Sequence, residues 1–360
     1  MSTNRKVIRY GAAWLLALIP VVGGCEGARR AQAAAPGSRT NPVLKPLLDV
    51  PLPGGVGRFD YQSLDPESGR LYIAQMGVGR LVVFDTRTNQ LVASITGFPR
   101  VTGVLAVPSM GRVYASVVGR HELAIVNSAT LDVQARIKDI RFPDGIAYAA
   151  EAGKVFVSDE SGEREIVVDA RGDSTRSVIP LGGEAGNTQY DSVGKRIWVA
   201  VQTRNQLVTI DPATERITGR YDLPGADHPH GFYIDAPHRL AFVSCEGNAR
   251  LLVVNLTTMR VTASHVVGDD PDVLAFDPGL ARLYVAAESG VISVFEQQGA
   301  ALHPLGEYRA PTAHSVSVDP ISHRVYLPLA NVGARPVLRV LAPAPMPGQP
   351  GAAPRTPAGP

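Results

Sequence analysis

The chain consists of short apolar segments that alternate with polar turns along most of its length. Each segment is four to seven residues long, rich in Val, Ile, Leu and Tyr, and bounded by Asp, Pro, Gly or Asn. This pattern is typical of short antiparallel strands joined by tight turns. One strand recurs in seven copies, which read GRLYIAQ, GRVYASV, GKVFVSD, KRIWVAV, HRLAFVS, ARLYVAA and HRVYLPL. We therefore predict an all-β protein built from repeated units.

The repeat has a period of about 42 residues. The residues that open the seven repeats, with spacings of 42, 42, 42, 44, 42 and 42, are Asp60, Thr102, Asp144, Gly186, His230, Asp272 and His314. Four strands in each 42-residue unit make one blade of a propeller, and radial repetition of blades protects sheet edges that would otherwise aggregate. The sequence thus predicts a seven-bladed β-propeller over residues 46–341.

The seventh repeat lacks one strand. It runs from His314 to Leu341, only 28 residues, whereas Pro46–Phe59 supplies 14 residues ahead of the first repeat. Within this segment VPLPG, residues 50–54, matches YDLPG, residues 221–225, at the end of the fourth repeat. We predict that the N-terminal segment pairs with Val337–Leu341 as the fourth strand of blade seven and closes the ring.

The two ends of the chain differ in composition from the repeats. Residues 1–25 combine a basic start, an apolar run and VGGC, which resembles the lipobox of bacterial lipoproteins, whose cysteine is lipidated. The resemblance implies an exported protein held at the cell envelope only by lipid on Cys25; a cleaved secretory signal and an uncleaved anchor are the alternatives. Residues 26–45 are predicted to be a tether, and the Pro/Ala/Gly tail 342–360 is predicted to be disordered.

The charge balance does not favour nucleic acid as a partner. Without residues 1–24, which hold three basic residues, 32 Lys and Arg (35 minus 3) stand against 33 Asp and Glu. A nearly neutral body gives no general attraction for phosphate. Single-stranded nucleic-acid binding stays a third alternative because arginines recur in the loops after the second strands, at Arg80, Arg120, Arg164, Arg204 and Arg250.

Polar side chains gather at one end of the predicted channel, where the repeat-opening residues form a ring. The second strands end at the same mouth, 16 residues later, at Met76, Val118, Glu160, Gln202, Glu246, Glu288 and Ala330. Imidazole nitrogen and carboxylate oxygen are the usual ligands of divalent metals. The predicted metal ligands on blades five to seven are His228, His230, Glu246, Asp272, Glu288 and His314. The predicted ligand-binding residues are His230, His314, Asp60, Asp144 and Glu160.

A structural interpretation applies to single residues of this set. An Asp at a strand start often accepts hydrogen bonds from the backbone of its own turn. We expect His238 and His323, in equivalent turns on the opposite face, to be structural, and Cys245 to pack in the core. Several carboxylates gathered without a cation would instead repel one another and raise each other's pKa, so a cation or cationic ligand is expected at the mouth.

Two family resemblances bear on these expectations. DPGLARLYVAAESGVISVF, residues 277–295, resembles the repeats of the YVTN-repeat propellers of exported bacterial proteins, and the likeness extends over residues 46–341. It implies the fold, while some relatives bind single-stranded DNA and others belong to surface layers. PHGF at His230 and FVSCE ending at Glu246 also resemble the virginiamycin B lyase-like propellers, in which a magnesium ion and a His/Glu set open a cyclic ester.

The leading functional interpretation is a monomeric, envelope-tethered propeller that binds a ligand or acts as a scaffold. Its partner would be an unknown ligand or envelope protein, and its candidate cofactor a divalent cation. A metal-dependent lyase or lactonase acting at the same mouth is the alternative. The sequence contains no G-x-S-x-G, H-E-x-x-H or C-x-x-C motif, which favours the non-enzymatic interpretation.

Overall fold

The computed structural model describes residues 43–344. The predicted targeting segment with Cys25, residues 26–42 of the predicted tether and residues 345–360 of the predicted tail lie outside the described residues. Within residues 43–344, no helix has both the length and the apolar character needed to traverse a lipid bilayer.

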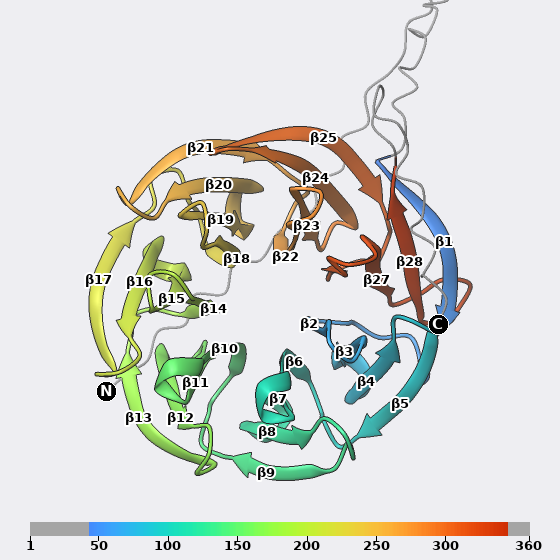
Figure 1. Ribbon diagram of the computed structural model, residues 1–360, viewed down its shortest axis with the longest axis horizontal. Helices are drawn as coiled ribbons and strands as arrows, with labels where there is room; N and C mark the ends of the chain where they lie inside the picture. The colour runs from blue at the N-terminus through green and yellow to red at the C-terminus, as the bar shows by residue number, and fades with distance from the viewer. Residues whose placement is uncertain (1–42, 345–360) are drawn as a thin grey trace, which may run out of the picture. The chain divides into compact units, whose positions relative to one another are not determined.

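Seven four-stranded antiparallel sheets surround a central channel, as Figure 1 shows. The prediction of an all-β, seven-bladed propeller is therefore confirmed. From the channel outward, blade one comprises β2 (Gln62–Asp65), β3 (Arg70–Gln75), β4 (Arg80–Asp85) and β5 (Gln90–Thr96). Blade two comprises β6 (Val101–Val107), β7 (Arg112–Val117), β8 (Glu122–Asn127) and β9 (Val133–Ile137). Blade three comprises β10 (Pro143–Ala149), β11 (Lys154–Asp159), β12 (Arg164–Asp169) and β13 (Ser174–Pro180).

The remaining blades follow the same order. Blade four comprises β14 (Ala185–Asp191), β15 (Arg196–Val201), β16 (Gln206–Asp211) and β17 (Arg216–Asp222). Blade five comprises β18 (Pro229–Asp235), β19 (Leu240–Cys245), β20 (Arg250–Asn255) and β21 (Arg260–Val266). Blade six comprises β22 (Pro271–Asp277), β23 (Arg282–Ala287), β24 (Val291–Gln298) and β25 (Ala301–Arg309). Blade seven comprises β26 (Ser317–Val318), β27 (Val325–Leu329), β28 (Val337–Pro343) and β1 (Leu44–Pro51).

Helical structure in the described residues is confined to single 3₁₀ turns. Four of them follow the second strands of their blades: η1 (Met76–Val78), η3 (Val118–Arg120), η5 (Gln202–Arg204) and η6 (Glu246–Asn248). Two follow first strands: η2 (Pro108–Met110) and η4 (Ala150–Ala152).

One aromatic side chain per blade fills the space between neighbouring sheets. The seven occupy the same position of the second strand and are Tyr72, Tyr114, Phe156, Trp198, Phe242, Tyr284 and Tyr326. All seven are buried. Because large aromatic side chains bury the most apolar surface, this single repeated position provides much of the contact that holds blade to blade. The repeat in the sequence is thus a repeat in the core.

Strand β1 closes the ring by pairing with β28, as predicted. The antiparallel register runs from Leu44 opposite Pro343 to Pro51 opposite Val337. The strand ends at Pro51 and does not extend to Phe59, because the prolines at positions 51 and 53 lack the N–H groups that a continued ladder needs. Beyond it the chain crosses from the outer rim to β2 at the channel (Figure 1).

The strand directions define two faces of the propeller. All first strands begin at one face, which we call the entry face, and end at the other, the exit face. Antiparallel pairing makes the third strand of each blade run in the same direction as the first. Strand β28 is the third strand of blade seven, so Pro343 lies at the exit face beside its partner Leu44.

Candidate functional site

Five of the seven repeat-opening residues, Asp60, Thr102, Asp144, His230 and Asp272, line a cavity of about 240 Å³ at the entry face of the channel. Carboxylates and imidazoles dominate it. We call this group the acidic mouth and define it as Asp60, Asp144, Glu160, His230, Glu246, Asp272, Glu288 and His314. The structure therefore brings together residues from blades one, three, five, six and seven that are as many as 254 positions apart in the sequence, from Asp60 to His314.

A break in strand register directs these side chains into the channel. In five blades the pairing of the first and second strands shifts next to the repeat-opening residue, for example between Pro143 and Ile146 and between Pro229 and Phe232. Such a bulge rotates the affected side chain out of the regular alternation of the strand. Asp144 and His230 lie within these two breaks, and their side chains reach the mouth.

Glycines after the repeat-opening residues allow the first strands to approach one another closely. A Cβ atom added at Gly103 would lie 1.9 Å from the carbonyl oxygen of Asp144, and one at Gly231 would lie 1.5 Å from that of Asp272. No larger residue fits at these distances without a backbone shift. The sequence indicates this close approach, because glycine follows the repeat-opening residue in three of the seven repeats.

His230 contacts three carboxylates of the acidic mouth. Its Nδ1 lies 2.8 Å from Oδ1 of Asp272 and 3.1 Å from Oε1 of Glu246, and its Nε2 lies 3.4 Å from Oδ2 of Asp144. Burial disfavours the charged imidazole, but the carboxylates of Asp272, Asp144 and Glu246 outweigh it and raise the pKa of His230 well above 6.5.

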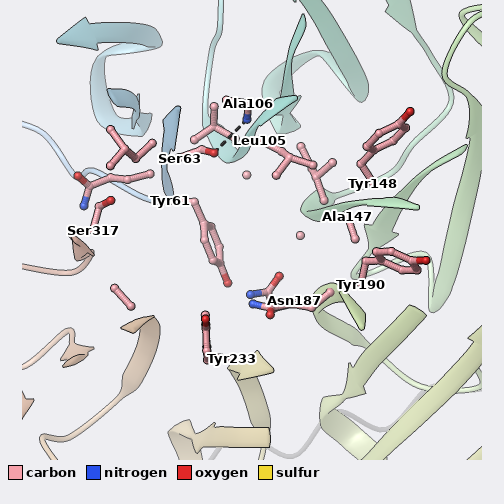
Figure 2. Close-up of a pocket in the computed structure, with 18 of the residues that line it drawn as sticks. Tyr61, Ser63, Leu105, Ala106, Ala147, Tyr148, Asn187, Tyr190, Tyr233 and Ser317 are labelled. Atoms are coloured by element: carbon pink, nitrogen blue, oxygen red, sulfur yellow. Dashed lines mark hydrogen bonds between the residues drawn. The ribbon is translucent and has the colours of Figure 1, made fainter. Parts of the chain in front are cut away.

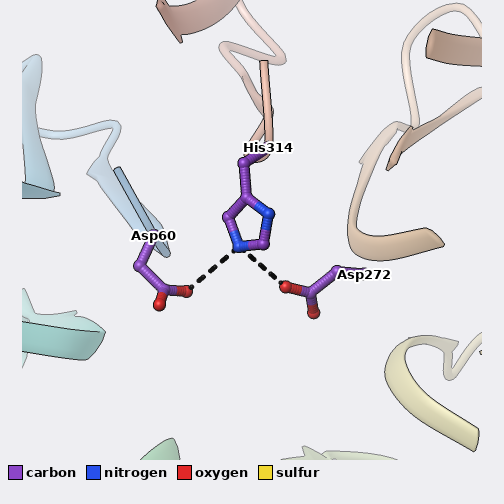
Figure 3. A group of neighbouring side chains, drawn as sticks. All are labelled: Asp60, Asp272 and His314. Atoms are coloured by element: carbon purple, nitrogen blue, oxygen red, sulfur yellow. Dashed lines mark ion pairs between the residues drawn. The ribbon is translucent and has the colours of Figure 1, made fainter. Parts of the chain in front are cut away.

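His314 joins the other side of Asp272. Figure 3 shows its Nε2 between two carboxylates, 3.0 Å from Oδ2 of Asp272 and 3.7 Å from Oδ1 of Asp60. Although burial opposes it, these carboxylates raise the pKa of His314 to about 10. Both imidazoles in turn hold the pKa of Asp272 below its usual value against the effect of burial. Asp272 is therefore the anion shared by the two histidines.

Arg58 is a member of the site that lies outside the repeated positions of the sequence. Its Nη1 lies 2.8 Å from Oε1 of Glu288, and its Nη2 lies 2.9 Å from Nε2 of His314. A protonated Nε2 donates to Asp272, whereas a bare Nε2 accepts from Arg58, and the raised pKa of His314 favours the first arrangement. Arg58 precedes the first repeat by two residues, so no repeat position points to it.

Glu160 makes no ion pair within the described residues, whereas Asp144 and Asp60 each contact only an imidazole that is shared with other carboxylates. Burial, followed by the charge of Asp144, raises the pKa of Glu160 to about 7, with His230 only partly opposing the shift. Oδ2 of Asp144 is buried and makes no hydrogen bond within the described residues. Asp60 likewise has a raised pKa because of burial, which His314 offsets in part.

His228 lies outside the acidic mouth. Its side chain is 53% exposed, and its Nδ1 contacts Oδ1 of the adjacent Asp227 at 2.8 Å. The residue takes a left-handed conformation with φ of 50°, and its carbonyl oxygen accepts a hydrogen bond from the backbone N–H of Glu246. His228 thus helps to position the Glu246 backbone, and it belongs to none of the groups of clustered side chains in the acidic mouth.

The residues expected to be structural make structural contacts. Nδ1 of His238 lies 2.7 Å from Asp235, and Nδ1 of His323 lies 2.8 Å from Asp277, both in turns between first and second strands. Cys245 is fully buried in an apolar cluster, and burial raises the pKa of its thiol to about 12. These three side chains stay apart from the mouth.

Three groups of side chains in the described part of the chain bring potential metal ligands within 4.8 Å of one another, and all three lie in the acidic mouth. The groups are Asp60 with Asp272 and His314, Asp144 with Glu160 and His230, and His230 with Glu246 and Asp272. Chemically the mouth can hold a cation between anionic oxygens and an imidazole nitrogen.

Comparison with known proteins supports the fold. No family model matches the chain, and no curated protein matches it. Among solved structures it is similar to hydrazine synthase of Kuenenia stuttgartiensis, with a TM-score of 0.66 and 13% identity over 80% of this chain and 96% of that one. It is also similar to U3-55K and to the WD40 repeats of RRP9, each with a TM-score of 0.70 and 8% identity over 83% of this chain and 99% of the other.

These similarities define the class of protein, a seven-bladed β-propeller, and at such low identity they show the fold alone. The resemblance to the YVTN-repeat group stays a prediction, because no family model matches.

Proposed function

We propose that this protein is a non-enzymatic, ligand-binding propeller that holds a divalent cation in its acidic mouth. The ligands would be Nε2 of His230 and the carboxylates of Asp144 and Glu160. The observation that carries the proposal is the convergence of these three groups within 4.8 Å, two of them buried. The site thus combines blades three and five, whereas the sequence placed the metal ligands on blades five to seven alone.

The hydrogen bond on the far side of the His230 ring supports this choice of ligands. Nδ1 lies 2.8 Å from Asp272, a distance at which an N–H donates to the carboxylate, so loss of the other ring proton would bare Nε2 for a metal. Histidines that bind metals commonly donate their other ring N–H to a carboxylate, which fixes the tautomer and the ring orientation. Nε2 then faces Asp144, whose Oδ2 makes no hydrogen bond within the described residues.

The charge of the mouth also favours a cation. Six carboxylates, those of Asp60, Asp144, Glu160, Glu246, Asp272 and Glu288, converge on it. The opposing positive charges are those of Arg58 and, when protonated, of two imidazoles. The negative charge exceeds the positive charge, and in a partly buried site a bound cation offsets the excess more effectively than screening by water.

The mixed ligand set suggests which ions suit the site. One imidazole nitrogen with two carboxylates favours a transition metal such as Zn²⁺ or Mn²⁺ over Ca²⁺, which prefers oxygen ligands alone. The same excess of negative charge repels phosphate, which argues against the nucleic-acid alternative. The lyase or lactonase alternative uses the same residues, and no contact in the mouth favours it over binding.

The test is metal binding by the full-length protein, measured by titration calorimetry with ZnCl₂ and by elemental analysis after dialysis. We expect about one equivalent in the wild type and its loss in the double variant Asp144→Asn, Glu160→Gln, which keeps side-chain size and removes both charges. His238→Ala, a turn histidine on the exit face, serves as the control and should bind like the wild type.

A chelator should lower the melting temperature of the wild type and not that of the double variant. An ion that binds only the folded state at a hundredfold excess over Kd stabilises it by about 2.7 kcal/mol. Binding must displace the proton of His230, so affinity should fall as the pH is lowered. Equal zinc content in the wild type and the double variant would refute the proposal.

Attachment to the cell envelope is the second part of the proposal, and it rests on the sequence VGGC at residues 22–25. Labelled palmitate should enter the wild type and not Cys25→Ser. Membrane fractionation gives an independent measure, because the variant should appear in the soluble fraction. Equal labelling of the two proteins would leave a cleaved secretory signal as the explanation.

A further inference from the structure

A second, larger cavity opens at the exit face of the channel. Its volume is about 640 Å³, within the range of small-molecule sites in proteins. The side chains that line it include no Asp, Glu, Lys, Arg or His. This composition contrasts with that of the acidic mouth at the other end of the same channel, so the two ends differ in the ligand that they can accept.

Aromatic side chains form one part of the wall. Tyr148, Tyr190, Tyr233 and Phe276 come from β10, β14, β18 and β22, the first strands of four consecutive blades. The rings of Tyr233 and Phe276 are 5.3 Å apart between centroids and tilted by 34°. Tyr148 and Tyr190 are only partly buried, so ring surface is available for contact with a ligand. Such surfaces favour a flat ring that can stack on them.

Two polar residues of the wall, Tyr61 and Asn187, directly follow repeat-opening residues and so lie at the end of the cavity nearest the acidic mouth. Figure 2 shows the side chains of Tyr61, Asn187 and Tyr233 pointing towards one another near the channel axis. Oδ1 of Asn187 accepts a hydrogen bond from the backbone N–H of Thr188, which leaves the amide N–H groups to face the cavity. The hydroxyl of Tyr61 donates to Oδ1 of Asp272 at 3.4 Å.

We propose that this cavity binds an uncharged ring compound that carries hydroxyl groups, of the class of a neutral aryl glycoside. The flat ring would stack on the tyrosines of blades three to five. Its hydroxyl oxygens would accept hydrogen bonds from the amide of Asn187 and exchange them with the hydroxyl of Tyr233. A charged ligand of the same size would lose its hydration without gaining an opposite charge from the wall.

The site is independent of the cation proposed for the acidic mouth. Tyr61 and Asn187 lie between the two ends, and neither belongs to the acidic mouth. The hydrogen bond from Tyr61 to Asp272 connects the two, and it uses none of the three proposed metal ligands. The inference therefore survives if the mouth binds no metal.

The experiment compares two probes that share one ring and differ in charge. Full-length protein is titrated with 4-nitrophenyl glucoside, which is neutral, and with 4-nitrophenyl phosphate, which is anionic, by calorimetry and saturation-transfer NMR. We expect the glucoside to bind at least tenfold more tightly than the phosphate, and Tyr148→Ala to weaken glucoside binding at least tenfold. Tyr221→Ala, a partly buried tyrosine on the outer strand β17, is the matched control and should bind as the wild type does.

Two results would overturn the inference. One is the absence of a saturation-transfer signal from the glucoside, or equal binding of the two probes, on the wild-type protein. The other is unchanged glucoside binding in Tyr148→Ala. The probe comparison needs no variant, so it decides the question even if Tyr148→Ala fails to fold.

Discussion

The closure of the ring by β1 should depend on one buried side chain, that of Leu44. This residue begins β1, is fully buried, and belongs to the apolar cluster that also contains Leu341 and Val337 of β28. Leu47, three residues later on the same strand, is 47% exposed. Replacing each leucine by alanine removes the same atoms from the same strand but from opposite environments.

The expected magnitudes follow from burial. Truncation of a fully buried leucine to alanine costs about 2–5 kcal/mol, because apolar contact is lost and a cavity remains. Truncation of an exposed leucine to alanine costs roughly 0.5 kcal/mol or less. For a domain of this size about 1 kcal/mol corresponds to a shift of roughly 2 °C, so Leu44→Ala should lower the melting temperature by roughly 4–10 °C and Leu47→Ala by about 1 °C.

The assay is calorimetric melting of the full-length proteins at one concentration and pH, with urea unfolding as a second measure. A loss at Leu44 would show that the N-terminal strand contributes to the cooperative unit of the ring. If the two variants had the same melting temperature, the closure of blade seven by β1 would not contribute to stability, and the reasoning from burial would be refuted.

Three further predictions concern buried side chains away from the mouth. Burial raises the pKa of Glu165 well above 4.5, so the wild type should lose stability as the pH rises above 4.5. In melting curves recorded over a pH series, Glu165→Gln should have a higher melting temperature than the wild type at pH 7 but not at pH 4. Arg239→Ala should lower the free energy of unfolding, measured in urea, by about 3–5 kcal/mol, because the fully buried Asp191, 2.7 Å from Arg239, loses its partner. A much smaller decrease would show that water reaches Asp191. Cys245 has a pKa of about 12, so in folded Cys25→Ser protein it should not react with a disulfide reagent, and it should react once the protein is unfolded. Rapid reaction in the folded state would contradict its burial.

The fold was predictable because the residues that every blade needs for packing recur in the sequence at a fixed spacing. Each blade needs one buried aromatic at the same position, and Tyr72, Tyr114 and their equivalents recur with the period of the blades. The missing strand of blade seven followed from the length of the seventh repeat. What the length of the N-terminal segment could not give was the end of β1, because residues 52–59 form the crossing to β2, as the residues after Asp222 lead from β17 to β18.

The site was predictable only as a set of positions. The repeat placed Asp144 and His230 at one mouth, but two contacts depend on geometry that no periodicity encodes. The backbone at His228 takes a left-handed conformation that turns its side chain outward. The guanidinium of Arg58 enters from the crossing segment before β2 to reach Glu288. Which nitrogen of His230 faces Asp144 depends likewise on the hydrogen bond to Asp272 across the ring.

The pairing of Leu44 with Pro343 has a consequence for how the molecule can be presented to its surroundings. Both ends of the ring emerge together at the exit face. A linker joined directly to residue 43 or to residue 344 would therefore leave the ring from the side of the uncharged cavity. A ring trimmed to residues 43–344 and immobilised by either end should display the acidic mouth outward in the same orientation, so a metal titration on a sensor surface should give the same affinity for both attachments.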